Sequence, residues 1–250
     1  MRLKDRIAIV TGGARGIGRG VAIAFAREGA HVLVNYLNRS NAAEEVVAEI
    51  EKLGRKALAV KADVASTVDA QNMVKMAIEK LGGLDILVNN AGLSQPAMLL
   101  NMTEAQWDRV INVHLKGTFN CTQAAARYMK EKNYGKIINV ISGAGIFGTI
   151  GQVNYSAAKG GIIAFTKSAA RELGPYKINV NAIGPGLTAT EMTEKVRTDP
   201  KLREIYTKRI FLGRFVEPEE LAATFVFLAS SESDYITSQV LSVDGGYSGG

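Results

Sequence analysis

Cysteine, histidine and proline are scarce in this sequence, with one, two and five copies among 250 residues. The lone Cys121 excludes a disulfide within the chain, which fits a reducing compartment. It lies in an apolar helical pattern, so we expect a buried, inert thiol. His31 and His114 lie far apart, without a cysteine or carboxylate cluster around them, and we therefore expect no metal site.

Long apolar runs and compositional boundaries are missing as well. No apolar run reaches the roughly 18 residues that span a membrane, and no signal-peptide core follows the charged first residues. No proline-rich, serine-rich or single-sign segment divides the chain, and no repeat of about 20–50 residues occurs. With 47% hydrophobic residues, we expect one cytoplasmic domain over residues 1–250.

The sequence instead alternates between two patterns. Short runs that are apolar throughout predict strands buried on both faces, and longer segments with apolar residues at helical spacing predict helices. This alternation predicts an α/β fold with a doubly wound parallel sheet of about seven strands, in which ligands bind beyond the carboxyl ends of the strands. The expected strands are residues 6–11, 31–36, 57–61, 85–89, 136–141, 177–183 and 239–243, and the expected helices are about 16–28, 41–53, 67–81, 103–131, 155–173 and 218–230.

A glycine-rich turn follows the first expected strand. Gly12, Gly16 and Gly18 stand between the apolar run 6–11 and a helical pattern. Glycines permit a tight turn and let the backbone approach a pyrophosphate at the helix N-terminus. The spacing differs from the common dinucleotide fingerprint, and a glycine turn without a ligand is the alternative. The position of the turn between a strand and a helix favours the interpretation that it binds a phosphate.

Tyr155 and Lys159 lie four residues apart, on one face of an expected helix. An ammonium near a phenol favours the phenolate, so we expect the pKa of Tyr155 to fall from about 10 toward neutrality. Such a phenol can donate a proton to a carbonyl oxygen. Taken alone, this spacing is more often a surface pair.

Five motifs occur in one order along the chain: Thr11-Gly12-x-x-x-Gly16-x-Gly18, Asn89-Asn90-Ala91-Gly92, Ser142, Tyr155-x-x-x-Lys159 and Pro185-Gly186. Together they resemble the short-chain dehydrogenase/reductase family, from about residue 5 to the C-terminus. This resemblance implies a single Rossmann-type domain. The stretches 89–92, 212–220 and 243–246 are most like those of 3-oxoacyl-[acyl-carrier-protein] reductases, although many carbonyl reductases and sugar dehydrogenases share them.

The resemblance implies a catalytic group of Asn112, Ser142, Tyr155 and Lys159. Tyr155 would be the general acid in reduction, and Lys159 would lower its pKa and hold the nicotinamide ribose. Ser142 would bind the substrate oxygen and stabilise the developing alkoxide. Asn112 would hold a water that links Lys159 to solvent, with a helix-bending asparagine as the alternative.

The end of the second expected strand favours NADP(H) over NAD(H). NAD-specific sites usually carry a carboxylate there, but Tyr36 stands at that position. Arg15 and Arg39 can neutralise a 2′-phosphate, and Asn35 and Ser40 can add neutral hydrogen bonds. Two solvated loop arginines are the alternative.

The resemblance also implies the other cofactor contacts. Asp63 is expected at the adenine amino group or, alternatively, as a turn residue, and Asn90 is as compatible with a structural role as with contact. Thr188 and Thr190 match positions that hold the carboxamide. The expected cofactor-binding residues, besides those of the preceding paragraphs, are Gly12, Gly16, Ile17, Gly18, Asp63, Val64, Asn89, Ala91, Gly92, Tyr155, Lys159, Pro185, Gly186, Thr188 and Thr190.

The sequence says less about the identity of the substrate than about that of the cofactor. Residues 190–212 are polar and helix-prone, which predicts a mobile substrate lid or, alternatively, a static pair of surface helices. The formal charge of +6 and the basic residues of that segment suit an anionic thioester on acyl carrier protein or coenzyme A. Spread charge without a recognition motif argues against nucleic acid. A dehydrogenase of a free alcohol, sugar or cyclic ketone and a non-catalytic NADP-binding sensor remain alternatives.

Two expected helices carry apolar residues on more than one face. These residues are Val110, Val113, Leu115 and Phe119 in 103–131, and Ile162, Ile163, Phe165 and Ala169 in 155–173. One face must cover the sheet, and the rest would form an apolar patch larger than monomers usually expose. In the family these helices pair across a two-fold axis, and the C-terminal segment forms a second interface. We therefore expect a homotetramer.

Overall fold

The computed structural model describes residues 1–248. All strand pairs are parallel, and the seven strands follow the order β3-β2-β1-β4-β5-β6-β7. The order reverses between β1 and β4, which makes this the switch point where ligands bind in doubly wound sheets. The strands are β1 (Ile7–Val10), β2 (His31–Tyr36), β3 (Ala57–Lys61), β4 (Ile86–Asn89), β5 (Gly135–Val140), β6 (Ile178–Pro185) and β7 (Val240–Val243).

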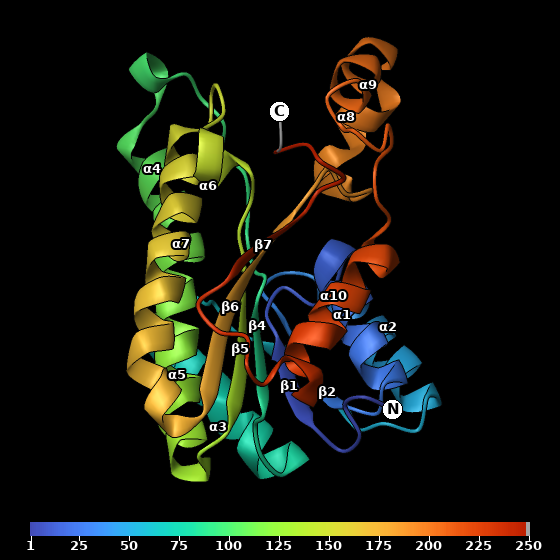
Figure 1. Cartoon of the computed structure of the whole chain (residues 1–250), viewed down its shortest axis with the longest axis vertical. Helices are drawn as coiled ribbons and strands as arrows, with labels where there is room; N and C mark the ends of the chain where they lie inside the picture. The colour runs from blue at the N-terminus through green and yellow to red at the C-terminus, as the bar shows by residue number, and fades with distance from the viewer. Residues whose placement is uncertain (249–250) are drawn as a thin grey trace.

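Helices cover both faces of the sheet (Figure 1). On one face lie α1 (Gly16–Arg27), α2 (Ser40–Lys52) and α10 (Pro218–Ala229), and their apolar sides form one core with the sheet. On the other face lie α3 (Thr67–Met76), α5 (Gly117–Lys132) and α7 (Val153–Leu173), with a second core. The predicted burial of the strands on both faces is therefore confirmed for the inner strands, whereas the edge strands β3 and β7 are partly exposed.

The predicted helix over 103–131 is continuous but not regular. It consists of α4 (Glu104–Ile111), a π-helical turn η3 (Asn112–Lys116) and α5. Its start is fixed by a capping box, in which Thr103 accepts from the Gln106 backbone and the Gln106 side chain accepts from Thr103. The helix expected over 67–81 likewise ends in a π turn, η1 (Ala77–Leu81), and the short α6 (Ala144–Phe147) was not predicted.

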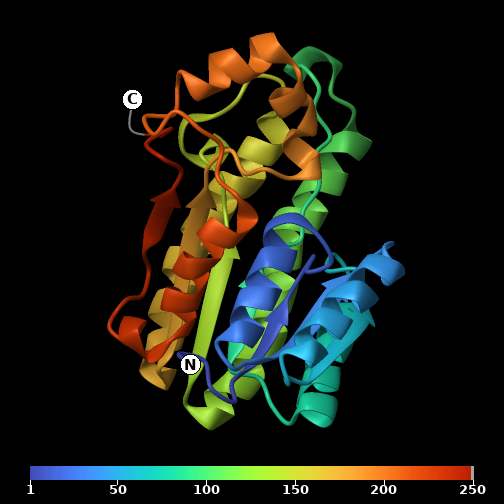
Figure 2. The same ribbon diagram turned by 90° about the vertical axis from the view of Figure 1, so that its right-hand side faces the viewer.

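The segment expected to form a lid is helical. It holds the 3-10 turn η5 (Glu191–Thr193), α8 (Glu194–Thr198) and α9 (Pro200–Thr207). Figures 1 and 2 place α8 and α9 beyond the carboxyl ends of the strands, apart from the two helical layers. The remaining 3-10 turns are η2 (Leu99–Asn101), η4 (Gly174–Tyr176) and η6 (Ser231–Ser233).

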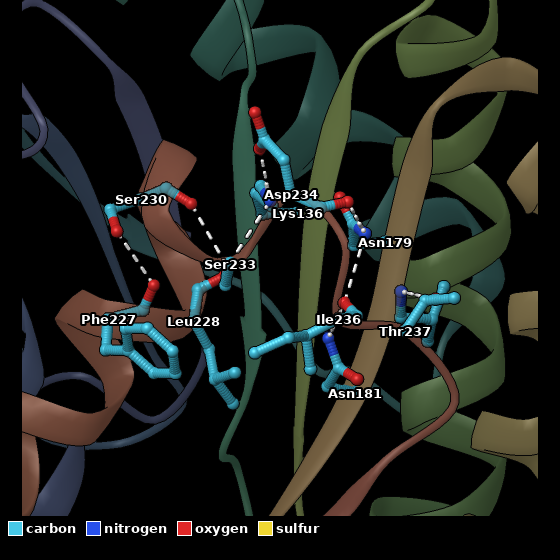
Figure 3. Close-up of polar contacts among 11 residues, drawn as sticks. Lys136, Asn179, Asn181, Phe227, Leu228, Ser230, Ser233, Asp234, Ile236 and Thr237 are labelled. Atoms are coloured by element: carbon cyan, nitrogen blue, oxygen red, sulfur yellow. Dashed lines mark hydrogen bonds and ion pairs between the residues drawn. The ribbon is translucent and has the colours of Figure 1, made fainter.

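The opposite end of the sheet contains a buried lysine (Figure 3). The side chain of Lys136, at the start of β5, is 1% exposed, and its Nζ lies 2.7 Å from Asp234 Oδ1 and 3.4 Å from Ser233 Oγ. Burial lowers the pKa of Lys136, while the hydrogen bond to Asp234 raises it. Asn179 and Asn181 both donate to the Ile236 carbonyl. These bonds fasten the segment between α10 and β7 to the amino ends of β5 and β6.

The chain itself buries half of the eight apolar residues that suggested an oligomer. Val110, Val113, Ile162 and Ala169 are buried, whereas Phe119 stays 44% exposed. The homotetramer stays a prediction, and the C-terminal segment expected at its second interface extends to residues 249–250, which lie outside the described residues. Within residues 1–248 no helix combines the length and apolar character needed to cross a bilayer.

Candidate active site

Lys159 and Tyr155 lie in the first turns of α7. The Lys159 side chain is buried, and its Nζ donates to the Val140 carbonyl at the end of β5 over 2.6 Å. This amine lies 5.5 Å from the centre of the Tyr155 ring. Burial lowers the pKa of Lys159 to about 7, so the charge of this amine changes near neutral pH.

Ser142 follows β5 and shares a hydrogen bond with the Tyr155 phenol. Burial raises the pKa of Tyr155, and the bond with Ser142 offsets part of that rise. The direction is opposite to the one predicted from the spacing of Tyr155 and Lys159. The reason is desolvation, which disfavours the phenolate and also weakens the charge on the lysine. The phenol therefore keeps its proton at neutral pH, as a general acid must.

His114 belongs to this cluster and was not predicted as a site residue. Its ring meets the Tyr155 ring edge-on, with 5.1 Å between centroids, and its Nε2 lies 2.8 Å from the Leu93 carbonyl oxygen. Burial and the nearby Lys159 lower the pKa of His114 to about 3, so the imidazole is neutral. Its Nδ1 is buried and has no hydrogen-bond partner within residues 1–248.

Asn112 was predicted to belong to the catalytic group with Tyr155 and Lys159, where it would hold a water. It begins the π turn η3 and is half-buried. Among the hydrogen bonds of the described residues, none joins its side chain to Ser142, Tyr155 or Lys159. Two residues further along the turn, His114 faces Tyr155 instead, because a π turn shifts which residues share a face of the helix. The water-holding role of Asn112 stays a prediction.

The glycine turn is shaped for close backbone approach. Gly12 and Gly16 have φ values of +62° and +52°, which other residues rarely adopt. A Cβ on Gly18 would collide with the Gly12 carbonyl oxygen. No side chain caps α1 at Arg15, and its first turn holds no acidic residue. The first N–H groups of α1 are therefore not satisfied by a side chain, and they suit an anionic ligand.

The loop after β4 braces this turn. The Thr11 hydroxyl accepts from the backbone N–H groups of Asn90 and Ala91, at 2.9 and 3.0 Å. Asn90 Nδ2 donates to the Thr11 and Gly12 carbonyls, which supports the structural role left open for it. The Asn89 amide donates to Asn139 and Thr122. A Cβ on Gly92 would strike the His114 ring, so this position also requires glycine.

Asn35 lies at the end of β2, where the sequence predicted a phosphate contact. Its side chain is 2% exposed. Its Nδ2 donates to the carbonyls of Val60 and Ala62, and its Oδ1 accepts from Gly12 N. These bonds engage both ends of the amide inside the protein, so a phosphate contact is not what this structure shows for Asn35. The side chain ties β2 to β3 and to the glycine turn.

The two arginines predicted to bind a 2′-phosphate lie together. Arg15 in the glycine turn and Arg39 before α2 both pair with Glu191, the first residue of η5. Tyr36 at the end of β2 is half-buried, and Ser40 begins α2 beside Arg39. The structure therefore brings two half-exposed guanidiniums to one carboxylate, and their contact with a 2′-phosphate stays a prediction.

Asp63 and Val64 follow β3. Asp63 Oδ1 accepts from Ala65 N at 3.0 Å, a turn contact, and Oδ2 lies 3.6 Å from Arg109. The turn interpretation of Asp63 is thus supported, and its contact with adenine stays a prediction. Val64 is buried, and a Cβ on Gly117 would press against it.

The loop after β6 closes the other side of the site. A Cβ on Gly186 would approach Asp244 Cα to 2.6 Å, so Pro185-Gly186 lies tightly against the segment after β7. Thr188 is buried and its hydroxyl donates to the Gly186 carbonyl. The Thr190 methyl group is the nearest contact for a Cβ built on Gly16. Ile17 is the second residue of α1 and follows Gly16.

The predicted site residues thus gather at the carboxyl ends of β1 to β6. An uncapped helix, a tight glycine turn and two arginines fit a dinucleotide with an anionic ribose end. The Tyr155 phenol, the Ser142 hydroxyl and the buried Lys159 amine lie where β5 ends and α7 begins, and they can polarise and protonate a carbonyl group. Within the described residues, no three His, Cys, Asp or Glu side chains are placed to hold a metal ion.

Known proteins resemble this chain over nearly its whole length. The family model described as enoyl-(acyl carrier protein) reductase matches residues 12–248. The 3-oxoacyl-[acyl-carrier-protein] reductase FabG of Thermotoga maritima is 44% identical over 246 residues, which cover 98% of this chain and 99% of that protein. The 3-oxoacyl-[acyl-carrier-protein] reductase of Synechocystis sp. is 44% identical over 245 residues, with 98% and 97% covered.

A solved structure shows the same arrangement in three dimensions. A short-chain type dehydrogenase/reductase from Mycobacterium marinum has a TM-score of 0.92 at 35% identity, covering 98% of this chain and 96% of that one. Sequence and structure therefore agree on the same group of proteins, and the family match over residues 12–248 includes Ser142, Tyr155 and Lys159.

Proposed function

This chain belongs to the short-chain dehydrogenase/reductase family, and from that premise we propose that it reduces 3-oxoacyl thioesters to 3-hydroxyacyl thioesters with NADPH. It is an oxidoreductase that acts on ketone and CH–OH groups. The finer assignment is supported by relatives named as 3-oxoacyl-[acyl-carrier-protein] reductases over almost the full chain.

The observation that carries the proposal is that Ser142, Tyr155 and the buried amine of Lys159 come together where β5 ends and α7 begins. When bound, a reduced nicotinamide supplies a hydride to the carbonyl carbon. As the C=O π electrons move to oxygen, the Tyr155 phenol donates its proton there, and the O–H bond of the alcohol forms. Ser142 donates a hydrogen bond to the same oxygen and stabilises its developing negative charge. Solvent then returns a proton to Tyr155.

Lys159 acts on this step through charge and position. The Val140 carbonyl holds its amine close to the phenol. When Tyr155 has given up its proton, a protonated Lys159 stabilises the phenolate left behind. The neutral imidazole of His114 packs on the Tyr155 ring and limits its motion.

The complete catalytic group argues against a non-catalytic NADP sensor, because a sensor needs no proton donor. A free alcohol, sugar or cyclic ketone remains the competing substrate. The thioester is favoured by basic side chains around the lid, which suit an anionic carrier. It is favoured also by exposed apolar side chains near the same end of the sheet, which suit an acyl chain. The basic residues are Arg197, Lys201, Arg203, Lys208 and Arg209, and the apolar ones are Leu99, Leu100, Ile146, Phe147 and Ile150.

A substrate panel tests the proposed function. We expect NADPH oxidation with an acetoacetyl thioester at a kcat/KM at least about tenfold above that with cyclic ketones, since the thioester engages the lid as well as the catalytic group. Glucose with NADP⁺ checks the oxidising direction. Equal or better turnover of a free ketone or sugar would reject the thioester, and no turnover of any carbonyl would support the sensor.

Arg15 and Arg39 are expected to set the preference for NADPH. Replacing both with alanine removes two cations from the 2′-phosphate, and charge-assisted hydrogen bonds contribute roughly 1.5–3 kcal/mol each. Because these side chains are half exposed, we expect the lower end, a loss of about 10²-fold in NADPH affinity and little change for NADH. Binding titrations with both cofactors measure it, and equal losses would show that the arginines do not read the phosphate.

A further inference from the structure

Glu191 fills the space between the two arginines. Its Oε2 lies 2.5 Å from Arg15 Nη1 and 3.1 Å from Arg39 Nη2, and its Oε1 lies 3.2 Å from Arg39 Nη1. The hydrogen bond with Arg15, followed by the charges of both arginines, lowers the pKa of Glu191. The carboxylate is therefore ionised at neutral pH, and the cluster carries one positive charge instead of two.

These three residues come from three separate parts of the fold. Arg15 belongs to the glycine turn, Arg39 to the loop after β2, and Glu191 to η5 at the start of the lid. The preceding Thr190 packs on Gly16, and its carbonyl accepts from Arg197 of α8. The carboxylate therefore joins the lid to both loops of the expected adenosine end. The side chains of Arg15, Arg39 and Glu191 are 50%, 54% and 52% exposed, so a ligand can reach this cluster from solvent.

We propose that Glu191 is a specificity-determining residue, an internal counter-ion that a 2′-phosphate must displace from Arg15 and Arg39. This inference rests on the proposed role of the two arginines in NADPH binding. Carboxylate and phosphate oxygens compete for the same guanidinium donors, and two anions in contact repel each other. A 2′-hydroxyl carries no charge and does not compete with Glu191 for the arginines, so NADH binds with the Glu191 contacts intact. Glu191 thus reduces the advantage of NADPH over NADH, and binding of NADPH releases the first turn of the lid.

The test removes the charge of Glu191 and keeps its shape. With Glu191→Gln we expect NADPH to bind about fivefold more tightly, as loss of an exposed ion-pair network implies. NADH affinity should stay within about twofold. Adenosine 2′,5′-bisphosphate and 5′-AMP, titrated in the same way, confine the measurement to the adenosine end and require no turnover. Glu194→Gln is the matched control, because Glu194 is an exposed acid of the same segment without an ion pair within residues 1–248.

The outcomes separate this proposal from the function on which it rests. Unchanged or weaker binding of NADPH to Glu191→Gln would overturn the counter-ion role, and so would an equal gain for 5′-AMP. An equal gain with Glu194→Gln would assign the effect to net charge and would also overturn it. If Arg15 and Arg39 prove essential for NADPH alone, the cofactor assignment stands whatever Glu191 does. If they do not, the cofactor assignment itself fails.

Discussion

Replacing Tyr155 with phenylalanine is expected to lower the rate of ketone reduction by about 10²- to 10⁴-fold, the usual contribution of a general acid. The ring keeps its packing against His114, and only the proton donor and the hydrogen bond with Ser142 are lost. We therefore expect NADPH affinity to change by less than about threefold, since no charged group is removed. Single-turnover rates and a binding titration measure the two quantities separately.

Tyr235→Phe serves as the control for this variant. Tyr235 is fully exposed in the segment between α10 and β7, at the amino end of the sheet, and the same hydroxyl is lost there without an effect expected on chemistry. A Tyr155→Phe enzyme that kept more than about a tenth of wild-type turnover would show that another group supplies the proton. Loss of cofactor binding to the same extent as activity would instead indicate a structural role.

Lys159→Met is expected to lower kcat/KM by at least about 100-fold, because a charge-assisted bond to the phenolate and one to the cofactor are lost together. The variant should fold, since a buried amine is replaced by an apolar chain of similar length. Lys167→Met on the same helix is the matched control, because Lys167 is exposed. Similar losses in the two variants would exclude a specific role for Lys159.

The same lysine predicts a pH dependence. Its pKa of about 7 means that the ammonium is present below neutrality and is lost as pH rises through about 7. We expect kcat/KM for reduction to fall across that range, because the free enzyme then lacks the charge that stabilises the phenolate. In Lys159→Met this inflection should disappear. A profile that kept it would assign the titration to a different group.

The strands were well predicted from sequence because each is a nearly continuous apolar run between turns. The π turn η3 could not be predicted, since its residues follow the same helical spacing as their neighbours. That turn explains why His114 was missed, because the sequence gives no signal of which residue of the turn faces Tyr155. Asn112 was named from the family resemblance, and its role stays a prediction. The pKa direction of Tyr155 was missed for a related reason, as spacing reports a neighbour but not the burial around it.

Contacts between segments that lie far apart along the chain could not be predicted from the sequence. The ion pair of Arg15 with Glu191 spans 176 residues and that of Arg39 spans 152, and no local pattern connects them. The two arginines were found because guanidiniums beside a glycine turn have a chemical meaning of their own. The bonds of the Asn35 amide could not be foreseen because Val60 lies on β3 and Ala62 directly after it; a contact of Asn35 with the phosphate stays a prediction.

The buried Lys136 has a consequence for the order in which the chain is made and folded. Its partners Ser233 and Asp234 come almost 100 residues later in synthesis; Ser233 lies 97 residues away. Until they emerge from the ribosome, β5 must keep its amine in water or bury it without a counter-ion, at a cost of several kcal/mol. We therefore expect the amino end of the sheet to close only when the segment that carries Ser233 and Asp234 has been synthesised and can pair with Lys136.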